Sequence, residues 1–502
     1  MVIKCSFENN SAKGIKQLKI YLCTYLQPLK HKKNIIVHMS DLVQNKKFEQ
    51  LRHQYPVFTY EDFSWRIKED ILILNFHFNL GNRYDFFPGH TIDLKNWSVN
   101  IPDDDVMDNL VFHIGMAELV SYWKASCSPT VFIKPYRLKP SQIRWWKKLY
   151  YQGLGEFFYL NKIDIGLDDF LTFYFEKNTT PAPSEFRIDL KDALLIPVGG
   201  GKDSVVTLNL LGKDNEKATA LIINQREATR QCIQRAGLDK NVFEVNRTIH
   251  PTLLELNEKG FLNGHTPFSS LLAFTSALAA VITGIKHIAL SNESSANEAT
   301  IPGTSINHQY SKSFEFEQDF RSYLFNFISP DINYFSFLRP LNELQIGALF
   351  SRNPEYFEVF KSCNAGSKTD TWCCNCSKCL FTFIMLSPFI EMSVMVKIFG
   401  EDLFENEKLE DTLYQLAGLA PEKPFECVGT INEVNSALAH LCQSKRYDQL
   451  PGLLKKYQKA TSGIKFTSLK EQLQYWNGFH TLIPGFEKLL KESLKTVQKD
   501  II

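Results

Sequence analysis

Leu194 to Leu211 spells LLIPVGGGKDSVVTLNLL, and this stretch decides the fold. The apolar run Leu194–Ile196 predicts a buried strand, and Val205–Leu211 predicts a helix. Free backbone N–H groups and the positive end of the helix dipole make such a strand–turn–helix an anion site. Glycines let the backbone approach a phosphate closely. The turn consists of Gly199, Gly200, Gly201, Lys202, Asp203 and Ser204.

The commonest phosphate-binding motifs do not fit this turn. GxxxxGK[ST] fails because Asp203 follows Lys202 and the glycines are contiguous, and GxGxxG is absent as well. The turn resembles the PP-loop, S-G-G-x-D-S, of the ATP pyrophosphatases, with Gly199 in place of the first serine. That resemblance implies cleavage of ATP between its α- and β-phosphates and adenylation of a substrate oxygen. The alternative is a tight turn without a ligand.

Length and composition indicate an ordinary globular protein of two or three domains. The chain has 502 residues, 44% hydrophobic and 22% charged, with 39 Phe to supply the core. A net charge of +1 gives no general reason to expect nucleic acid or a membrane surface as partner. The start, MVIKCSFENN, has no apolar core of a signal peptide, and Leu271 to Gly284 is too short to span a bilayer. We therefore expect a cytoplasmic protein.

Three parts follow from the patterns along the chain. Residues 1–185 predict an α+β domain, in which Ile71–Leu80 alternates as a strand and His77 is a strand residue on the wetter face. Residues 186–400 alternate strands and helices, which predicts a mostly parallel sheet with helices on both faces. Residues 401–502 predict a helical region, with helices expected over Leu409–Leu416, Ile431–Leu441 and Asp448–Tyr457, and with Thr430 and Glu433 as a capping box. No motif in the first part indicates chemistry.

Four polar clusters in the middle part are expected to meet in one crevice. The glycine turn, Asn224–Arg226 and Ser291–Glu298 each follow a predicted strand, and Asn263–Pro267 precedes the predicted helix Ser269–Gly284. Ligands of parallel sheets bind beyond the carboxyl ends of the strands. This convergence indicates an enzyme.

Candidates for proton transfer lie in and after these clusters. His265 suits either capping of the following helix or polarisation of a substrate carbonyl. His308 opens a segment rich in proton donors and acceptors that includes Lys312; the alternative is a surface or capping histidine. Cys427 is either an inert core thiol or an acid/base group.

Five cysteines crowd between Cys363 and Cys379. The thiolates of Cys363, Cys373, Cys376 and Cys379 match the spacing of a closed tetrahedral zinc site, which leaves Cys374 spare. Four thiolates leave no open position, so such a metal is structural and holds a loop near the crevice. An iron–sulfur cluster and unliganded thiols are the alternatives.

Two family resemblances rest on these residues. The glycine turn with the late cysteines is similar to the 7-cyano-7-deazaguanine synthases, PP-loop enzymes with a four-cysteine zinc site. The wider chain, the N-terminal part included, resembles the UDP-N-acetyl-α-D-muramoyl-L-alanyl-L-glutamate epimerases, the MurL family. The strings that carry this second resemblance are Gly199 to Ser204, Leu262 to Phe268, Ser291 to Glu298, Asn307 to Glu317 and Pro424 to Thr430.

The MurL resemblance implies an ATP-dependent epimerisation. The terminal L-Glu of UDP-MurNAc-L-Ala-L-Glu becomes D-Glu through an acyl-adenylate, with release of AMP and pyrophosphate, in peptidoglycan precursor synthesis. Adenylation is required because a carboxylate resists loss of the α-proton, whereas a neutral mixed anhydride makes that proton acidic. A muramyl ligase that adds L-Glu would be the functional partner, and neither nucleic acid nor membrane is expected.

The same resemblance implies roles for the candidate residues. The glycine turn binds the β,γ-phosphates, Lys202 adds charge and Asp203 helps to hold Mg²⁺. Glu293 or Glu298 is a second Mg²⁺ ligand or a base, His265 and His308 move the proton, and Lys312 and Cys427 are reserves. The expected substrate contacts are Asn263, Asn292, Asn297 and Asn307. ATP, Mg²⁺ and a structural Zn²⁺ complete the set.

Two other functions fit part of this pattern. The first is a PP-loop enzyme that adenylates a nucleobase or tRNA, although the chain has neither a basic surplus nor a recognisable RNA module. The second is a non-catalytic, metal-stabilised nucleotide-binding protein.

Overall fold

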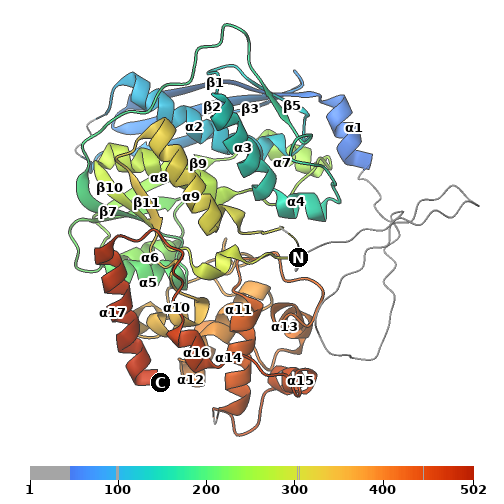
Figure 1. Cartoon of the computed structure of the whole chain (residues 1–502), viewed down its shortest axis with the longest axis vertical. Helices are drawn as coiled ribbons and strands as arrows, with labels where there is room; N and C mark the ends of the chain where they lie inside the picture. Colours follow the sequence, from blue (N-terminus) through green and yellow to red (C-terminus); the bar gives the residue numbers. More distant parts are fainter. Residues whose placement is uncertain (1–45, 98–100, 302–303, 305, 445, 502) are drawn as a thin grey trace, which may run out of the picture. The chain divides into compact units, whose positions relative to one another are not determined.

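The computed structural model describes residues 46–97, 101–301, 304, 306–444 and 446–501. Its strands form one sheet in the order β11-β10-β7-β8-β9-β4-β2-β1-β5-β6, with β3 paired to β2 (Figure 1). The strand bounds are β1 (Val57–Lys68), β2 (Ile71–Leu80), β3 (Tyr84–Phe86), β4 (Gly89–Asp93), β5 (Thr130–Ile133), β6 (Thr172–Tyr174), β7 (Lys191–Pro197), β8 (Ala218–Ile223), β9 (Val242–Thr248), β10 (Ile285–Leu290) and β11 (Asn333–Ser336).

The predicted parallel sheet is formed by β7 to β11. Pairs β11/β10, β10/β7, β7/β8 and β8/β9 are all parallel. From β7 the chain adds β8 and β9 on one side, and then returns to add β10 and β11 on the other. The connections therefore diverge between β7 and β10, which is where sheets of this kind bind ligands.

The sheet continues into the N-terminal part through an antiparallel pair, β4 with β9. A buried cluster supports this junction: Arg247 of β9 donates a hydrogen bond to Glu118 at 2.8 Å, and His90 of β4 lies 2.8 Å from the same carboxylate. Burial opposes ionisation of Glu118, but Arg247 and His90 outweigh it and hold its pKa at about 2. The boundary expected at residue 185 falls between β6 and β7, and the three-part division stays a prediction.

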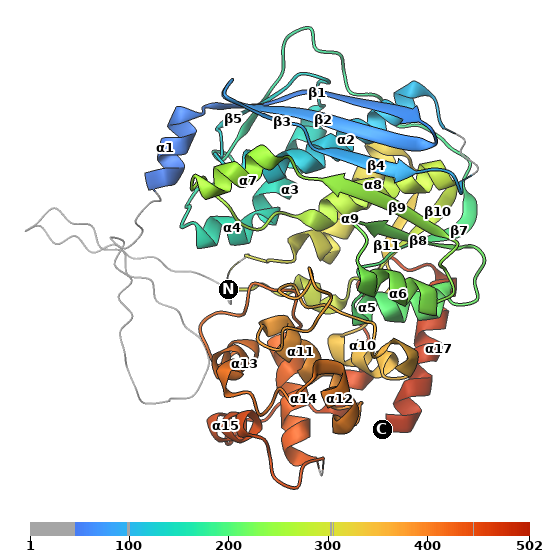
Figure 2. The ribbon, with the colours of Figure 1, turned by 180° about the vertical axis from the view of Figure 1, so that it is seen from behind.

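Helices cover both faces of the parallel half. On one face α2 (Asp104–Trp123) and α8 (Phe268–Thr283) pack against each other, with α3 (Pro140–Gly153) and α9 (Phe314–Tyr323) nearby (Figure 2). On the other face lie α5 (Lys202–Thr207), its continuation η1 (Leu208–Gly212) and α10 (Glu343–Phe350). The remaining α-helices among the described residues up to 330 are α1 (Lys46–Gln54), α4 (Gly155–Leu160), α6 (Glu227–Arg235) and α7 (Pro251–Glu258).

The N-terminal part contains the predicted strand over Ile71–Leu80, with Leu72, Leu74, Phe76, Phe78 and Leu80 all buried. His77 on its other face bonds Asp85 at 2.8 Å, as a strand residue on the wetter side would. Its neighbour β1 was not predicted, although Phe63, Trp65 and Ile67 alternate with polar residues in its second half.

The C-terminal part is helical, as expected. Its α-helices are α13 (Glu410–Leu416), α14 (Ile431–Gln443), α15 (Gly452–Ala460), α16 (Leu469–Gln474) and α17 (Pro484–Ile501), and α11 (Ser377–Leu386) and α12 (Met392–Phe399) precede it. The capping box of Thr430 and Glu433 is present at the start of α14. The helix predicted from Asp448 was wrong at its start: it begins at Gly452, because Pro451 is extended and a proline keeps the preceding residue out of helical geometry.

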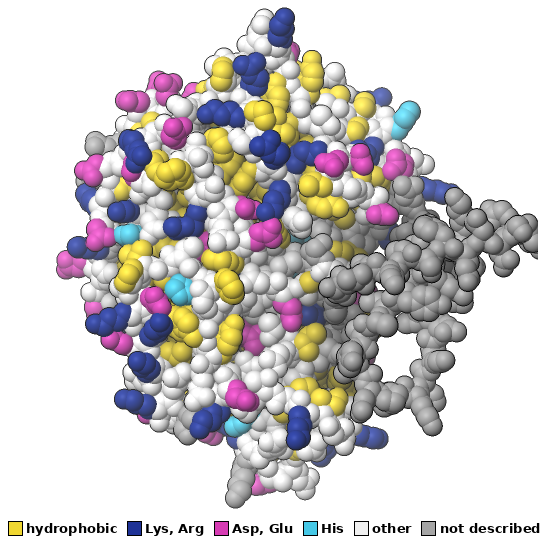
Figure 3. Space-filling model, in the orientation of Figure 1, with side chains coloured by type: hydrophobic (Ala, Val, Ile, Leu, Met, Phe, Trp, Pro, Cys, Tyr) yellow, Lys and Arg dark blue, Asp and Glu magenta, His cyan; other side chains and the backbone are white. Residues whose placement is uncertain are grey.

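Side chains of both charge signs are interspersed over the face shown in Figure 3, in keeping with the net charge of +1. Among the described residues, no helix combines the length and apolar character needed to cross a membrane. The first ten residues, from which we expected no signal peptide, lie outside the described part of the chain.

Candidate active site

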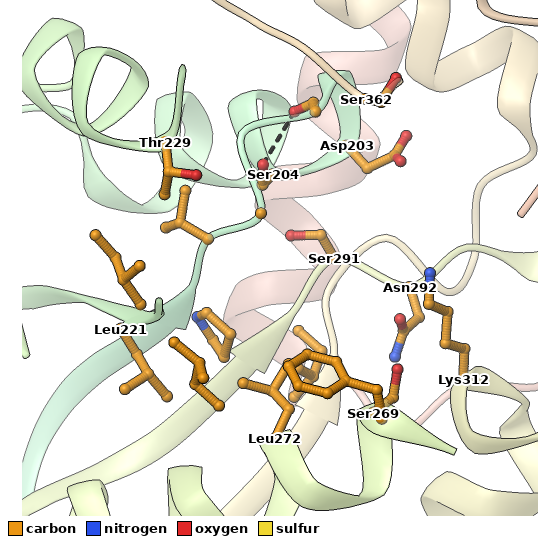
Figure 4. Close-up of a pocket in the computed structure, with 18 of the residues that line it drawn as sticks. Asp203, Ser204, Leu221, Thr229, Ser269, Leu272, Ser291, Asn292, Lys312 and Ser362 are labelled. Atoms are coloured by element: carbon orange, nitrogen blue, oxygen red, sulfur yellow. Dashed lines mark hydrogen bonds between the residues drawn. The ribbon is translucent and has the colours of Figure 1, made fainter. Parts of the chain in front are cut away.

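A cavity of about 380 Å³ opens at the point where the connections after β7 and β10 diverge. Its polar side includes Asp203, Asn292 and Lys312, and its apolar side includes Leu221 and Leu272 (Figure 4). Three of the four predicted polar clusters contribute to it: the glycine turn, the cluster after β8 and the cluster after β10. The lining residues from these clusters are Gly199, Gly201, Asp203, Ser204, Asn224, Arg226, Ser291, Asn292 and Glu293.

The glycine turn has the shape of a phosphate-binding loop. Gly200 has a φ of +82°, and a Cβ there would lie 3.1 Å from the backbone nitrogen of Thr229. A Cβ on Gly199 would meet no atom within 4 Å, so the backbone borders open space at that point. The Ser204 hydroxyl accepts a hydrogen bond from the Gly200 N–H at 3.1 Å and donates one to the Gly201 carbonyl at 2.9 Å, which fixes the turn. An anion can therefore approach the backbone directly.

Lys202 does not face this cavity. Its ammonium is buried between the carboxylates of Asp203 and Glu343, and both contacts are direct. Burial favours the neutral amine, but the two carboxylates outweigh it and raise the pKa of Lys202. Lys202 therefore fixes Asp203 and the start of α5 to α10. The basic side chains that do line the cavity are Arg226, Lys312, Lys361 and Lys378.

Two further features point to a polar ligand. The hydroxyl of Ser291 is buried at the cavity wall and has no hydrogen-bond partner among the described residues. Glu293 is 7% exposed and also lines the cavity, and burial together with the charge of Asp203 raises its pKa. A cation between these two carboxylates would relieve their repulsion, so the pair fits a magnesium ion.

The fourth polar cluster, around His265, lies at a second centre beside the cavity. The rings of His265 and His308 are 4.2 Å apart between centroids, and both approach the carboxylate of Glu156, His265 at 3.8 Å and His308 in direct contact. The ammonium of Lys312 lies 3.2 Å from the sulfur of Cys427. Lys312 also lines the cavity, so it connects the two centres.

Burial and neighbouring groups in this second centre shift the pKa values of His265, His308 and Cys427. Burial, with His308 and two lysines nearby, lowers the pKa of His265 to about 3. Burial also acts against charge on His308, but hydrogen bonds to Cys427 and Glu156 outweigh it and raise that pKa to about 9. Burial raises the pKa of Cys427, but Lys312 and His308 bring it well below its usual value. The centre therefore favours a neutral imidazole at His265, a protonated imidazole at His308 and ionisation of the Cys427 thiol.

The four asparagines predicted to contact the substrate do not lie in one cavity. Asn292 lines the first cavity. Asn297 accepts a hydrogen bond from the Phe314 N–H at 2.8 Å, Asn307 donates one to the Ala296 carbonyl at 2.8 Å, and both line a different cavity of about 450 Å³. Asn263 is exposed and is part of neither cavity. Glu298 contacts Lys423 directly and is not part of either cavity wall.

The four predicted cysteine ligands converge. Their sulfurs lie within 4.8 Å of one another, with separations of 3.8 Å for Cys363–Cys376 and for Cys373–Cys379, and 3.5 Å for Cys376–Cys379. Zinc held tetrahedrally at about 2.3 Å places its sulfurs about 3.8 Å apart, so the site could hold a zinc ion. In [2Fe–2S] and [4Fe–4S] clusters the four thiolates are divided among different irons, which needs wider spacing between some of the sulfurs. Cys374 turns away and donates to the Phe399 carbonyl at 3.0 Å.

The cysteine site adjoins the first cavity. Lys361, Ser362, Asn364 and Lys378 line the cavity and lie next to Cys363 and Cys379 in the chain. A metal bound by the cysteines would therefore fix part of the cavity wall. The expected structural role of the metal agrees with this position.

Two buried residues that organise the site were not predicted from the sequence. Glu156 lies on α4 in the part that showed no chemistry motif, far along the chain from its partner His308. Arg339 is fully buried and donates hydrogen bonds to the carbonyls of Glu293 and Lys312, both at 2.6 Å, and to the carboxylate of Glu317 at 3.1 Å. Arg339 thus holds two cavity residues in place. Its only sequence signal was a charged residue three positions after the buried strand β11.

The chain is similar to proteins of one known family. Two family profiles match: the MurL N-terminal domain over residues 49–337 and the MurL C-terminal domain over residues 359–470. The UDP-N-acetyl-alpha-D-muramoyl-L-alanyl-L-glutamate epimerase of Xanthomonas oryzae pv. oryzae is 34% identical over 338 residues, which are 66% of this chain and 74% of the relative. Proteins of the same name from a Micromonospora species and from Salinispora tropica are each 33% identical, over 66% of this chain and 74% and 73% of their own. No solved structure matches the chain.

Proposed function

The chain belongs to the MurL family, and on this premise we propose that it is an ATP-dependent epimerase of peptidoglycan precursor synthesis in the cytoplasm. Its substrate is UDP-MurNAc-L-Ala-L-Glu, supplied by the ligase that adds L-Glu. The enzyme adenylates the α-carboxylate of the terminal glutamate, inverts the α-carbon and hydrolyses the activated acyl group. The products are the D-Glu dipeptide, AMP and pyrophosphate.

The first cavity, with a PP-loop-like fold around it, is the adenylation site in this proposal. The glycine turn binds the β- and γ-phosphates through its backbone, and Arg226, Lys361 and Lys378 provide positive charge. The apolar wall with Leu221 and Leu272 suits the adenine ring. Asp203 and Glu293 hold Mg²⁺, which neutralises charge on the phosphates. Asn292 contacts the dipeptide.

The second centre provides the proton transfer. His265 is neutral and can accept a proton, whereas His308 is protonated and can donate one. The observation that carries the proposal is the position of Lys312. Because Lys312 lines the cavity and also contacts Cys427, an acyl group activated in the cavity lies within the length of one side chain of the proton-transfer groups.

Two variants separate the half-reactions. Asp203→Ala should abolish substrate-dependent pyrophosphate release, with the exposed Asp239→Ala as a matched control that retains it. His308→Ala should retain pyrophosphate release but slow the exchange of the α-proton with deuterated water. Near-normal pyrophosphate release by Asp203→Ala would remove the glycine turn from the mechanism, and unchanged exchange by His308→Ala would exclude that histidine.

A further inference from the structure

Cys427 occupies a position that proton transfer alone does not explain. The residue is half-buried, and its thiol lies between two cations, the ammonium of Lys312 at 3.2 Å and the imidazole of His308, which hydrogen-bonds it. His308 in turn contacts the carboxylate of Glu156 through Nδ1. Glu156, His308 and Cys427 therefore form a carboxylate–imidazole–thiol series. Enzymes with a cysteine nucleophile use such a series, in which the carboxylate orients the imidazole and the imidazole activates the sulfur.

The contact between Cys427 and His308 argues against their acting as a pair of opposed bases. Inversion by two bases needs one group on each face of the α-carbon. Two side chains that hydrogen-bond each other approach a substrate from the same side. The geometry suits attack by the sulfur while the imidazole holds the compensating charge.

The segment that carries Cys427 is anchored to the wall of the first cavity. The amide of Asn364, which lines the cavity, donates a hydrogen bond to the carboxylate of Glu426 at 2.6 Å. The ammonium of Lys423 donates to the carbonyl of Gly429 at 2.9 Å and also contacts Glu298, which lies after β10. Residues on both sides of Cys427 thus connect its segment with the elements around the cavity, and Lys312 connects the thiol itself.

We infer that Cys427 attacks the adenylated α-carboxyl of the substrate and carries the glutamyl group as a thioester while the α-carbon is inverted. This inference rests on the proposed function. The sulfur lone pair forms the new S–C bond, and the C–O bond to the phosphate of AMP breaks, so that AMP leaves with the electron pair. The step consumes no oxidant, reductant or further co-reactant.

A thioester suits the inversion that follows. Sulfur donates electrons to a carbonyl poorly, so the α-proton of a thioester is more acidic than that of a carboxylate or an oxygen ester. His265, which is neutral and next to His308, is placed to take this proton and pass it to solvent, while a proton from solvent reaches the opposite face of the planar enolate. Water then breaks the C–S bond, its oxygen joins the acyl carbon, and its proton passes to the imidazole pair as the thiolate is released.

The test is a single turnover of the full-length enzyme with ATP, Mg²⁺ and UDP-MurNAc-L-Ala-L-Glu, quenched in acid at successive times and digested for mass spectrometry. We expect an acyl adduct on the peptide that contains Cys427, which appears with AMP, precedes free D-Glu product and is removed by hydroxylamine. Absence of the adduct at every time point, in a reaction that does yield D-Glu, overturns the inference.

Variants provide the second readout. Cys427→Ala should form no adduct and lose at least about 100-fold in epimerisation, while substrate-dependent exchange of pyrophosphate into ATP persists and shows that the protein is folded. The matched control is Cys442→Ser, a thiol on α14 that donates a hydrogen bond to the Leu454 carbonyl and should leave every step unchanged. Epimerisation by Cys427→Ala at more than about one-hundredth of the normal rate also overturns the inference. Failure of the wild-type enzyme to form any AMP would instead count against the proposed function.

Discussion

Replacement of Glu156 by glutamine removes the charge that faces His308 and keeps the size of the side chain. The pKa of His308 is about 9 in the folded protein against 6.5 for an ordinary histidine, because Cys427 and Glu156 outweigh the effect of burial. This difference corresponds to about 3 kcal/mol of stability. A raised histidine pKa contributes fully below pH 6.5, and its contribution is lost as the pH rises through 9. Since two partners share the effect, we expect Glu156→Gln to cost about 1 to 2 kcal/mol at pH 6.

Urea unfolding at pH 6 and pH 9.5, followed by circular dichroism, measures this effect. The difference between wild type and Glu156→Gln should shrink to about 0.5 kcal/mol or less at pH 9.5, because His308 is then mostly neutral in both proteins. Glu422→Gln is the control, since Glu422 is exposed, bonds Tyr159 and does not face His308. The alkaline limit of epimerase activity should also move to lower pH in Glu156→Gln. Equal destabilisation at both pH values would refute the assigned charge on His308.

Three further predictions concern the metal site, the glycine turn and the buried arginine. Cys363→Ser should lower the zinc content of the purified protein and its thermal stability, whereas Cys374→Ser, which replaces the spare thiol, should keep the metal. Equal zinc contents of the two variants, measured by elemental analysis, would contradict the four-cysteine site. Gly200→Ala should cost about 1 to 2 kcal/mol because of its positive φ, while Gly199→Ala, with open space at its Cβ, should change stability by less than about 0.5 kcal/mol in urea unfolding. Arg339→Met should cost about 3 to 5 kcal/mol, since it leaves Glu317 buried without its cation, and a stability within about 1 kcal/mol of wild type would show that Arg339 is not needed there.

The parts of the fold that were predicted correctly carry local signals. Three features depend only on residues that are close together in the sequence. They are the strand and helix around the glycine turn, the alternation over Ile71–Leu80 and the capping box at Thr430. The strand β1 was not predicted, although Phe63, Trp65 and Ile67 alternate with polar residues in its outer half, where it pairs with β2. The start of α15 depended on a single proline.

The residues of the candidate site also divide into those with a local sequence pattern and those without one. The cysteines and the glycine turn have characteristic spacing, so their convergence could be predicted from the chain alone. The orientation of Lys202 could not, because its partner Glu343 lies on another helix and becomes a neighbour only when α5 packs on α10. The contact between Glu156 and His308 likewise joins segments 152 residues apart, for which the sequence has no local pattern.

Activation of the glutamate by ATP before inversion is most directly tested by counting AMP against inverted product. The protein is incubated with Mg²⁺ and UDP-MurNAc-L-Ala-L-Glu in deuterated water, with and without ATP, and the glutamate is released and separated by chirality. We expect D-glutamate with deuterium at the α-carbon, only when ATP is present, and at least one AMP for each D-glutamate formed. D-glutamate in the absence of ATP, or D-glutamate in excess of AMP, would contradict activation by adenylation.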